Sequence, residues 1–339
     1  MNGKIGGPAH NKGAARYFLD GRPARSENDH MDGLPQGFAS SVISSQQHTL
    51  KAAISCVGTG VHSGRRVALT LRPAAIDNGI VFHRSDLGRA IPARFDRVAD
   101  TRLATTLADE ADPECRIGTV EHLLAALTGA GLDNVDVEVD GPEIPILDGS
   151  AAQWLFLIDC AGTEEQAASR RALHVLKPVR VANGEAWAEL SPMGAHEGLE
   201  LSVVIDFAAM AIGRQSLSLR LTAASFRHEL SRARTFALAE DVDALRAAGL
   251  AQGGGLHNAV VVDGAKVLNP GGLRMPDEFA RHKLLDAVGD LALAGGALRA
   301  RYRTHRGGHA LNNRLLHALF ADPTAWREDV GASVSHAAA

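Results

Sequence analysis

The segment that decides the fold and chemistry of this chain covers residues 276–296 and reads P-D-E-F-A-R-H-K-L-L-D-A-V-G-D-L-A-L-A-G-G. It predicts a helix, because proline and acidic residues are favoured in a first turn and paired glycines end the pattern. His282 and Asp286 are four residues apart, so their side chains lie on one face, one turn apart. An imidazole and a carboxylate so placed can bind one Zn²⁺, and a third protein ligand would leave a position open for water.

Asp290 lies one further turn along the same face. A row of three polar residues is unusual in a helix that is otherwise so apolar. The alternative interpretation is a solvated polar stripe with ordinary surface ion pairs, and this helix alone does not decide between the two. The residues of the apolar face are Phe279, Leu284, Leu285, Val288 and Leu291.

Length and composition limit the class of protein. The chain has 339 residues, a formal net charge of -4 and 45% hydrophobic residues. This length allows two domains with sizeable cores, and the lack of a basic surplus argues against nucleic acid as a partner. No apolar run has the length of a transmembrane helix, and the N-terminus lacks the apolar region of a signal peptide. Cys56, Cys115 and Cys160 have no metal or redox spacing, so we expect reduced thiols in a cytoplasmic protein.

The pattern of residues divides the chain into four parts. Residues 1–47 are rich in Gly, Ala, Ser, Arg and Asn without apolar periodicity, which predicts a disordered extension. A first α+β domain is expected over residues 48–168, and a polar, acidic break near 162–169 separates it from a second over 169–325. Residues 326–339 are expected to form a flexible tail. Strands are expected at 67–71, 135–139, 175–181, 187–190 and 199–205, and helices at 120–127 and 223–230.

A weak internal sequence similarity relates the two halves of the chain. The segments E-H-L-L-A-A at 121–126 and R-H-K-L-L at 281–285 both place a histidine near a helix start, ahead of apolar residues. A duplicated α+β unit would pack two such helices across a pseudo-symmetric interface, where sites often form. This similarity suggests His122 as the third ligand of the metal. The neighbouring Glu121 could then take a proton from bound water, although a capping or surface glutamate is the commoner reason for such a residue.

Another candidate lies in R-G-G-H-A-L-N-N at residues 306–313. Gly307 and Gly308 allow unusual backbone angles and close approach just before His309. A histidine held on such a turn suits a general acid, because a leaving amine must be protonated as its C–N bond breaks. A structural histidine with satisfied hydrogen bonds is the alternative.

Taken together, these motifs resemble the UDP-3-O-acyl-N-acetylglucosamine deacetylases, the zinc enzymes of bacterial lipid A synthesis. The resemblance runs from about residue 49 to residue 322, in order and with few gaps. The matching segments are G-T-G-V-H-S-G-R-R-V (58–67), T-V-E-H-L-L-A-A-L (119–127), L-D-N-V (132–135), G-P-E-I-P-I-L-D-G-S-A-A (141–152), S-R-A-R-T-F (231–236), G-L-R-M-P-D-E-F-A-R-H-K-L-L-D-A-V-G-D-L (272–291) and G-G-H-A-L-N-N (307–313).

The resemblance implies a metal site and a reaction. His122, His282 and Asp286 would bind Zn²⁺, or alternatively Fe²⁺, with water completing the site, and Glu121 would be the general base. The reaction would be the hydrolytic deacetylation of UDP-3-O-acyl-N-acetylglucosamine to UDP-3-O-acylglucosamine and acetate, the committed step of lipid A biosynthesis. The enzyme would be a monomer in the cytoplasm of a Gram-negative bacterium.

The resemblance also implies roles for residues outside the metal shell. His309 would be the general acid for the glucosamine nitrogen, with Asp290 as its charge partner, and Thr235 would help to stabilise the oxyanion. The chain departs from the family at Ala186, where some members carry a lysine that meets phosphate, and at His257, where an aspartate is frequent. The positions that would lie in or near the substrate site are Phe236, Lys283, His62 and Asp241.

The implied fold is α+β. Two similar domains, each a β-sheet with helices, would pack as sheet–helix–helix–sheet, with one insert per domain. The second insert would be a β-α-β piece at about 237–267 that forms an apolar passage for the acyl chain. Its helix is expected at 241–248 and its strand at 259–262.

Two other functions are compatible with parts of the sequence. A paralogue could keep the zinc amidase chemistry and act on another N-acetylated sugar. A non-catalytic protein could bind a sugar nucleotide as a regulator, but all five residues of the metal shell and the acid–base pair are present here. A zinc peptidase is disfavoured because the motif H-E-x-x-H is absent.

Overall fold

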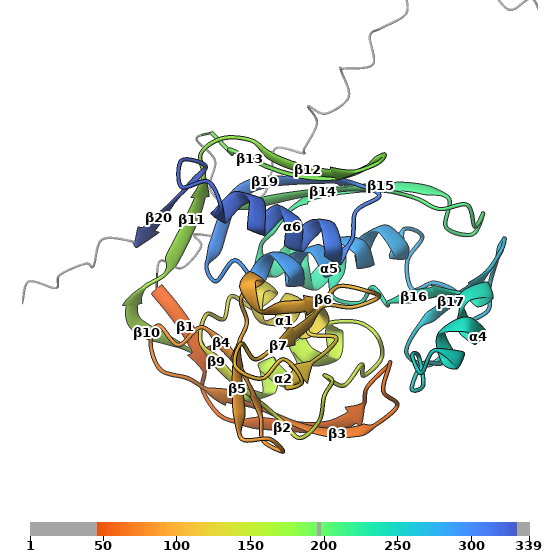
Figure 1. The fold of residues 1–339 in the computed structure, drawn as a ribbon, viewed down its shortest axis with the longest axis horizontal. Helices are drawn as coiled ribbons and strands as arrows, with labels where there is room; N and C mark the ends of the chain where they lie inside the picture. Colours follow the sequence, from red (N-terminus) through yellow and green to blue (C-terminus); the bar gives the residue numbers. More distant parts are fainter. Residues whose placement is uncertain (1–45, 195–197, 331–339) are drawn as a thin grey trace, which may run out of the picture. The chain divides into compact units, whose positions relative to one another are not determined.

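A computed structural model describes residues 46–194 and 198–330, and two large β-sheets enclose helices there (Figure 1). Along the short direction of Figure 1, the layers are one sheet, the helices α1 and α2, the helices α5 and α6, and the other sheet. This order confirms the predicted α+β architecture with helices in the middle layers. All described residues belong to one compact unit, and no helix among them is long and apolar enough to span a membrane.

The sheet of the first half has the strand order β2-β3-β9-β4-β5. Its neighbours are antiparallel except for β4 and β9, which are parallel. Buried and more exposed residues alternate along β3 and β9, so one face of the sheet is apolar and packs on the helices. The elements are β2 (Ile54–Thr59), β3 (Arg66–Pro73), β4 (Ile80–Arg84), β5 (Arg89–Pro92), β9 (Val135–Val139), α1 (Glu121–Gly129) and α2 (Ala152–Ala161).

The sheet of the second half is centred on β19. One edge of β19 pairs antiparallel with β13, and the strand also pairs in parallel with β11 and β14. The elements are β11 (Arg171–Val175), β12 (Val179–Asn183), β13 (Ala186–Ser191), β14 (Leu199–Asp206), β15 (Arg214–Arg220), β19 (Ala297–His305), β20 (Trp326–Val330), α5 (Glu278–Ala292) and α6 (His309–Phe320).

Smaller elements extend both halves. A β-α-β piece lies where the insert is expected, since β16 and β17 are parallel and α4 connects them. A three-stranded sheet of β6, β7 and β8 is the corresponding addition to the first half. The elements are β1 (Gln46–Leu50), β6 (Val98–Asp100), β7 (Thr106–Ala108), β8 (Arg116–Ile117), β10 (Thr163–Ser169), β16 (Phe236–Leu238), α4 (Ala239–Ala247), β17 (Val260–Asp263), β18 (Lys266–Val267), the 3₁₀-helix η1 (Phe95–Arg97), α3 (Ala223–Ser225) and the π-helix η2 (Phe226–Leu230).

The single strand predicted at 175–181 is wrong. Those residues end β11 and begin β12, and the chain leaves the sheet between them at residues 176–178. Pro178 explains the break, because proline has no N–H to donate to a neighbouring strand. Apolar residues lie on both sides of the proline, which made the two short strands resemble one.

The ends of the ordered chain also differ from the prediction. The sequence predicts that Gln47 belongs to the disordered extension, but this residue lies in β1, is 3% exposed and donates to Asp77 Oδ1 at 2.7 Å. The predicted tail begins with β20, which pairs antiparallel with β11, and the Trp326 ring packs on Phe320 with centroids 5.0 Å apart. The rest of both segments, residues 1–45 and 331–339, lies outside the described residues.

The predicted break near 162–169 is mostly a strand. Residues 163–169 form β10, which pairs antiparallel with β1. The acidic residues that suggested a linker occupy positions in this two-stranded ribbon. The domain boundary at residue 168 stays a prediction.

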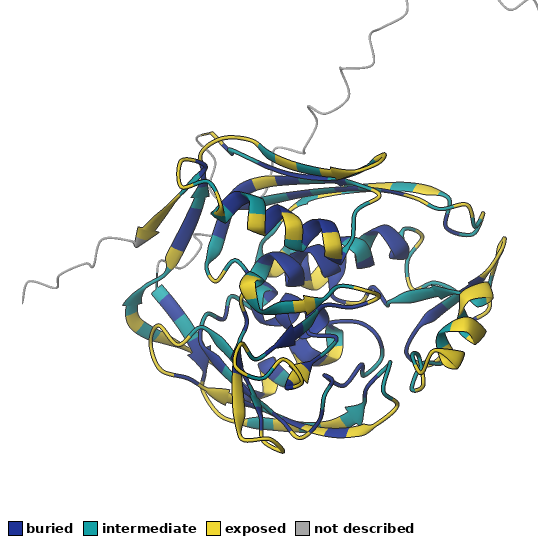
Figure 2. Cartoon of the chain, in the orientation of Figure 1, coloured by how far each residue is buried: buried dark blue, intermediate teal, exposed yellow. Residues whose placement is uncertain are grey.

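The helices α1 and α5 cross at the centre of the described chain, and Figure 2 shows them largely buried. Gly289 makes this crossing possible. A β-carbon added at Gly289 would lie 2.0 Å from the backbone oxygen of Glu121, so only glycine lets the two helices approach this closely. The crossing brings the first turn of α1 against the middle of α5.

Candidate active site

Six buried polar side chains gather where three helices meet. Glu121 and His122 open α1, His309 opens α6, and three residues come from α5. None of the six is more than 8% exposed, although such side chains are rarely this buried in proteins. The residues from α5 are His282, Asp286 and Asp290. Their burial excludes the alternative of a solvated polar stripe.

Three of these side chains form what we call the ligand cluster: His122, His282 and Asp286. One potential ligand atom from each lies within 4.8 Å of the other two. Asp286 Oδ1 is 3.5 Å from His122 Nε2 and 3.2 Å from His282 Nε2. This oxygen is buried and has no hydrogen-bond partner in the part of the chain that the structure describes. Two imidazoles and one carboxylate that converge in this way are a common donor set for Zn²⁺.

Neighbouring groups orient the ligand cluster. Nδ1 of His282 is 3.1 Å from the carbonyl oxygen of Ala233. A carbonyl can only accept, so Nδ1 carries the proton and Nε2 keeps the lone pair that a metal needs. Lys283 Nζ donates to the other carboxylate oxygen of Asp286 at 3.0 Å. Burial lowers the pKa of His282 to about 3, which keeps its ring neutral and able to act as a ligand.

The remaining residues form a second network beside the ligand cluster. Asp290 accepts from His309 Nδ1 at 2.8 Å, from Asn312 Nδ2 at 2.8 Å and from Thr105 Oγ1 at 2.6 Å. The backbone N–H of Thr105 also donates to Glu121 Oε2 at 3.0 Å. The other oxygen of Glu121 is 4.0 Å from His309 Nε2. A carboxylate and an imidazole therefore face each other at the edge of the ligand cluster, and Thr105 links the carboxylate of Glu121 to Asp290, which binds the imidazole.

The surroundings raise the pKa of both groups, for different reasons. Burial raises the pKa of Glu121, so this carboxyl holds a proton more readily than an exposed glutamate. Burial alone would lower the pKa of His309, but Asp290 outweighs it and raises the value to about 9. Near neutral pH the imidazole is therefore protonated and can act as an acid. A carboxyl group and an imidazolium that face each other in this way can serve as a base and an acid.

The other predicted site residues lie at varying distances. The Phe236 ring is 6.3 Å from the His282 ring, and Lys283 Nζ is 5.5 Å from the Phe236 centroid. Thr235 precedes Phe236, and its backbone N–H donates to Gly149 at 2.8 Å. His62 has a buried Nδ1 without a hydrogen-bond partner in the described ranges, while its backbone N–H donates to Glu143.

Three further positions lie on the periphery. Asp241 is exposed in the first turn of α4, and none of the described contacts joins it to the ligand cluster. Ala186 is half-buried at the start of β13, and His257 is exposed. The Glu185 side chain, next to Ala186, binds Arg306 at 2.8 Å.

Sequence reasoning missed a cavity beside Lys283. Its volume is about 310 Å³. It offers an aromatic ring from Phe207 and two cations, Lys283 and Arg306. The signal that could have found it is the sequence I-D-F at the end of β14, where polar and aromatic groups follow a buried strand. The lining residues are Ile205, Asp206, Phe207, Ala208, Lys283, Arg306 and Gly307.

Comparison with known proteins decides the family. The sequence model of the UDP-3-O-acyl N-acetylglycosamine deacetylases matches residues 47–321. The chain belongs to this family. Proteins named UDP-3-O-acyl-N-acetylglucosamine deacetylase from Acidithiobacillus ferrooxidans and Idiomarina loihiensis are each 48% identical over 285 residues, which is 83% of this chain and 92% of theirs. The protein of that name from Haemophilus influenzae is 46% identical with the same coverage.

Membership in this deacetylase family confirms the resemblance drawn from the motifs. The match from 47 to 321 contains the ligand cluster, the Glu121–His309 pair and the cavity. It begins within β1, so it also places Gln47 in the folded part of the deacetylase.

Proposed function

We propose that the protein is a zinc-dependent amidohydrolase that converts UDP-3-O-acyl-N-acetylglucosamine to UDP-3-O-acylglucosamine and acetate in lipid A biosynthesis. The observation that carries this proposal is the convergence of the ligand cluster with Glu121 and His309 in one buried site of a deacetylase-family chain. The proposed location is the cytoplasm, with the protein acting as a monomer.

His122, His282 and Asp286 fit a divalent ion. Two features of the described residues support this fit: Asp286 Oδ1 is buried without a hydrogen-bond partner, and His282 is held in the tautomer that presents Nε2. A divalent ion bound there supplies Lewis-acid chemistry, because it polarises a carbonyl oxygen and makes water a stronger acid. Zn²⁺ suits this donor set best, and Fe²⁺ accepts the same ligands.

The chain's own residues divide the proton transfers. Glu121 takes a proton from the water that attacks the acetamide carbon, and its raised pKa makes it a more effective base near neutral pH. Near neutral pH His309 carries protons on both ring nitrogens, because Asp290 raises its pKa to about 9: Nδ1 donates to Asp290, and Nε2 holds the proton that can be transferred. That proton passes to the glucosamine nitrogen as the C–N bond breaks, so acetate and the free amine leave. Thr235 is proposed to help stabilise the negative charge on the carbonyl oxygen.

The surroundings of the site suit a sugar nucleotide with an acyl chain. The cavity beside Lys283 combines the Phe207 ring, on which a uracil can stack, with Lys283 and Arg306, which can neutralise a diphosphate. Phe236 extends from the insert toward the ligand cluster. We assign the acyl chain to the insert at about 237–267, and His62 and Asp241 to the wall of the substrate site.

The test is acetate release from the acylated UDP-sugar by protein of known metal content. Glu121→Gln should retain zinc and lose about 10²-fold or more in kcat, and His309→Ala should behave likewise. His122→Ala should lose zinc and activity together. Glu189→Gln, at a buried glutamate that binds Arg303, and His317→Ala, at an exposed position of α6, are the matched controls.

Two results would contradict the proposal. One is zinc-loaded wild-type protein that releases no acetate from this substrate but deacetylates another N-acetylated sugar. The other is a His122→Ala variant that keeps stoichiometric zinc and normal turnover.

A further inference from the structure

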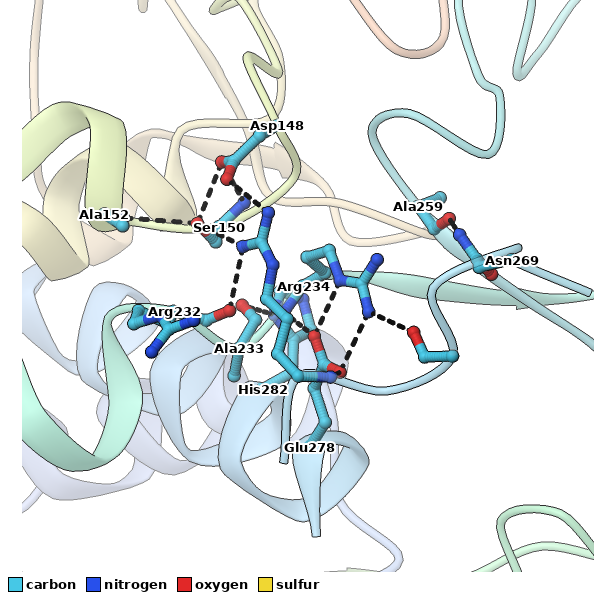
Figure 3. A network of polar contacts seen from close by, with 12 residues as sticks. Asp148, Ser150, Ala152, Arg232, Ala233, Arg234, Ala259, Asn269, Glu278 and His282 are labelled. Atoms are coloured by element: carbon cyan, nitrogen blue, oxygen red, sulfur yellow. Dashed lines mark hydrogen bonds and ion pairs between the residues drawn. The ribbon is translucent and has the colours of Figure 1, made fainter. Parts of the chain in front are cut away.

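A buried glutamate anchors the segment that leads to the ligand cluster (Figure 3). Glu278 is the first residue of α5 and is fully buried. Its carboxylate accepts from Arg234 Nε at 2.8 Å and from Nη2 at 3.1 Å, so the arginine binds it with two donors. The backbone N–H groups of Arg234 and Arg274 donate to the same carboxylate at 3.0 and 2.7 Å. Four donors on one buried carboxylate fix the position of Arg234.

A second arginine holds the other side of the same segment. Arg274 Nη1 donates to the carbonyl of Arg232 at 3.0 Å, and Nη2 donates to Asp148 Oδ2 at 2.8 Å. Asp148 also accepts from the hydroxyl of Ser150, just before α2. The backbone is therefore held at Arg232 and at Arg234, with Ala233 between the two.

Ala233 connects the segment held by the two arginines to the ligand cluster. Its carbonyl accepts from Nδ1 of His282 at 3.1 Å. Glu278 and His282 are one turn apart in α5, so both side chains point from one helix face toward residues 233–234. The carboxylate sets the path of this backbone, and the backbone presents the carbonyl to the imidazole.

We propose that Glu278 is a positioning residue for the metal site. By anchoring Arg234 it holds the Ala233 carbonyl against Nδ1 of His282, and so presents Nε2 of that ring as a metal donor. The inference rests on the proposed function, since it concerns the same metal site. Partners that orient a ligating histidine typically change metal affinity by about 10- to 100-fold when they are removed.

A purely structural ion pair would stabilise the fold without this effect. Glu278→Gln separates the two roles, because the amide keeps the size of the side chain but turns one accepting oxygen into a donor that faces other donors. Glu189→Gln is the matched control: Glu189 is 8% exposed and accepts from Arg303, and it is not part of the proposed site.

The experiment measures zinc dissociation constants by competition with a fluorescent chelator, together with melting temperatures. We expect Glu278→Gln to bind zinc at least about tenfold more weakly, and Glu189→Gln to bind it as tightly as wild type even where its melting temperature falls as far. The imidazole ¹⁵N shifts of metal-free protein should show the His282 proton on Nδ1 in wild type and shared between both nitrogens in Glu278→Gln.

Should Glu278→Gln not fold, Arg234→Lys is read in the same way, because lysine keeps the charge but loses the two-donor contact. Zinc affinity within twofold of wild type, or an unchanged His282 tautomer, would overturn the inference. Wild-type protein that binds no zinc would instead refute the proposed function itself.

Discussion

The crossing of α1 and α5 leaves no room for a side chain at Gly289. We predict that Gly289→Ala lowers both stability and turnover. In an ordinary helix the same change would stabilise the protein, because alanine is favoured over glycine by about 1 kcal/mol. The sign of the effect therefore tests whether the close approach seen here governs this position.

The distance to Glu121 gives the magnitude. A β-carbon at Gly289 would lie 2.0 Å from the backbone oxygen of Glu121, whereas real β-carbons essentially never come within 3.0 Å of such an atom. The helices must move apart by at least the difference, 1.0 Å. Overpacking of this kind costs about 1–3 kcal/mol. Here the added atom would meet a backbone oxygen, which cannot rotate away as a side chain can, so we expect a cost in the upper half of that range. After the propensity gain, the net loss is about 1–2 kcal/mol.

The displacement also acts on catalysis. Glu121 and His122 are in the first turn of α1, and Asp286 is in α5, so separating the helices pulls the proposed base and one ligand away from the others. A misplacement of about 1 Å can lower a rate by about 10²-fold. The assay is thermal unfolding of metal-free protein with kcat for acetate release, in a series Gly289→Ala and Gly289→Ser.

Gly129→Ala is the control, because its added β-carbon would meet the Phe226 ring at the far end of α1. It should lower the melting temperature while leaving kcat within about twofold, since the first turn of α1 stays in place. A Gly289→Ala variant that melts at or above the wild-type temperature with unchanged kcat would refute the reasoning.

Four further predictions concern other parts of the chain. Thr105→Val removes the hydroxyl that donates to Asp290 but keeps the backbone contact to Glu121, so kcat should fall about tenfold with zinc content unchanged. The control variant Thr106→Val should not lower kcat in this way. Ala186→Lys should lower KM for the UDP substrate at constant kcat, with a gain that shrinks in salt; an unchanged KM at low ionic strength would remove Ala186 from the substrate site. Deleting residues 1–45 should leave melting temperature and kcat nearly unchanged, because β1 begins at Gln46 and that stretch offers no apolar face to bury; a drop of several degrees would contradict this. The pKa of His309 is raised from 6.5 to about 9, so its contribution to the stability of the fold is full below pH 6.5 and is lost as the pH rises through 9. The unfolding free energy of the metal-free wild type, relative to that of His309→Gln, should therefore fall over that interval. A difference that stays constant with pH would contradict the raised pKa.

Sequence reasoning worked best where the site is local to one helix. The four-residue spacing of His282, Asp286 and Asp290 predicted a shared face, and all three lie buried on α5. The third ligand, His122, could be predicted only from the weak internal similarity and the family resemblance. Spacing alone cannot bring together residues that are 160 positions apart. The crossing of α1 and α5 at Gly289 does so. A single glycine in an apolar helix is too common to predict such a helix crossing.

Contacts made by the backbone could not be predicted at all. The carbonyl of Ala233 and the N–H of Thr105 orient His282 and Glu121, but every residue carries such groups. Their position depends on the path of loops held by Glu278 and by the short strands around Thr105. The single strand predicted at 175–181 failed for a related reason, because periodicity describes faces and not where a chain turns.

The same contacts explain how the core tolerates so many ionisable groups. An isolated buried charge is strongly unfavourable, so such groups must be paired and hydrogen-bonded. Asp290 and Glu278 meet this condition within the described chain through several donors each. Asp286 does so at only one oxygen, through Lys283, while its Oδ1 faces two imidazoles at 3.2 and 3.5 Å. Asp290 and Glu278 are satisfied by protein donors, so the unsatisfied oxygen of Asp286 indicates where a cation would stabilise the fold. That is also where the proposed chemistry requires one.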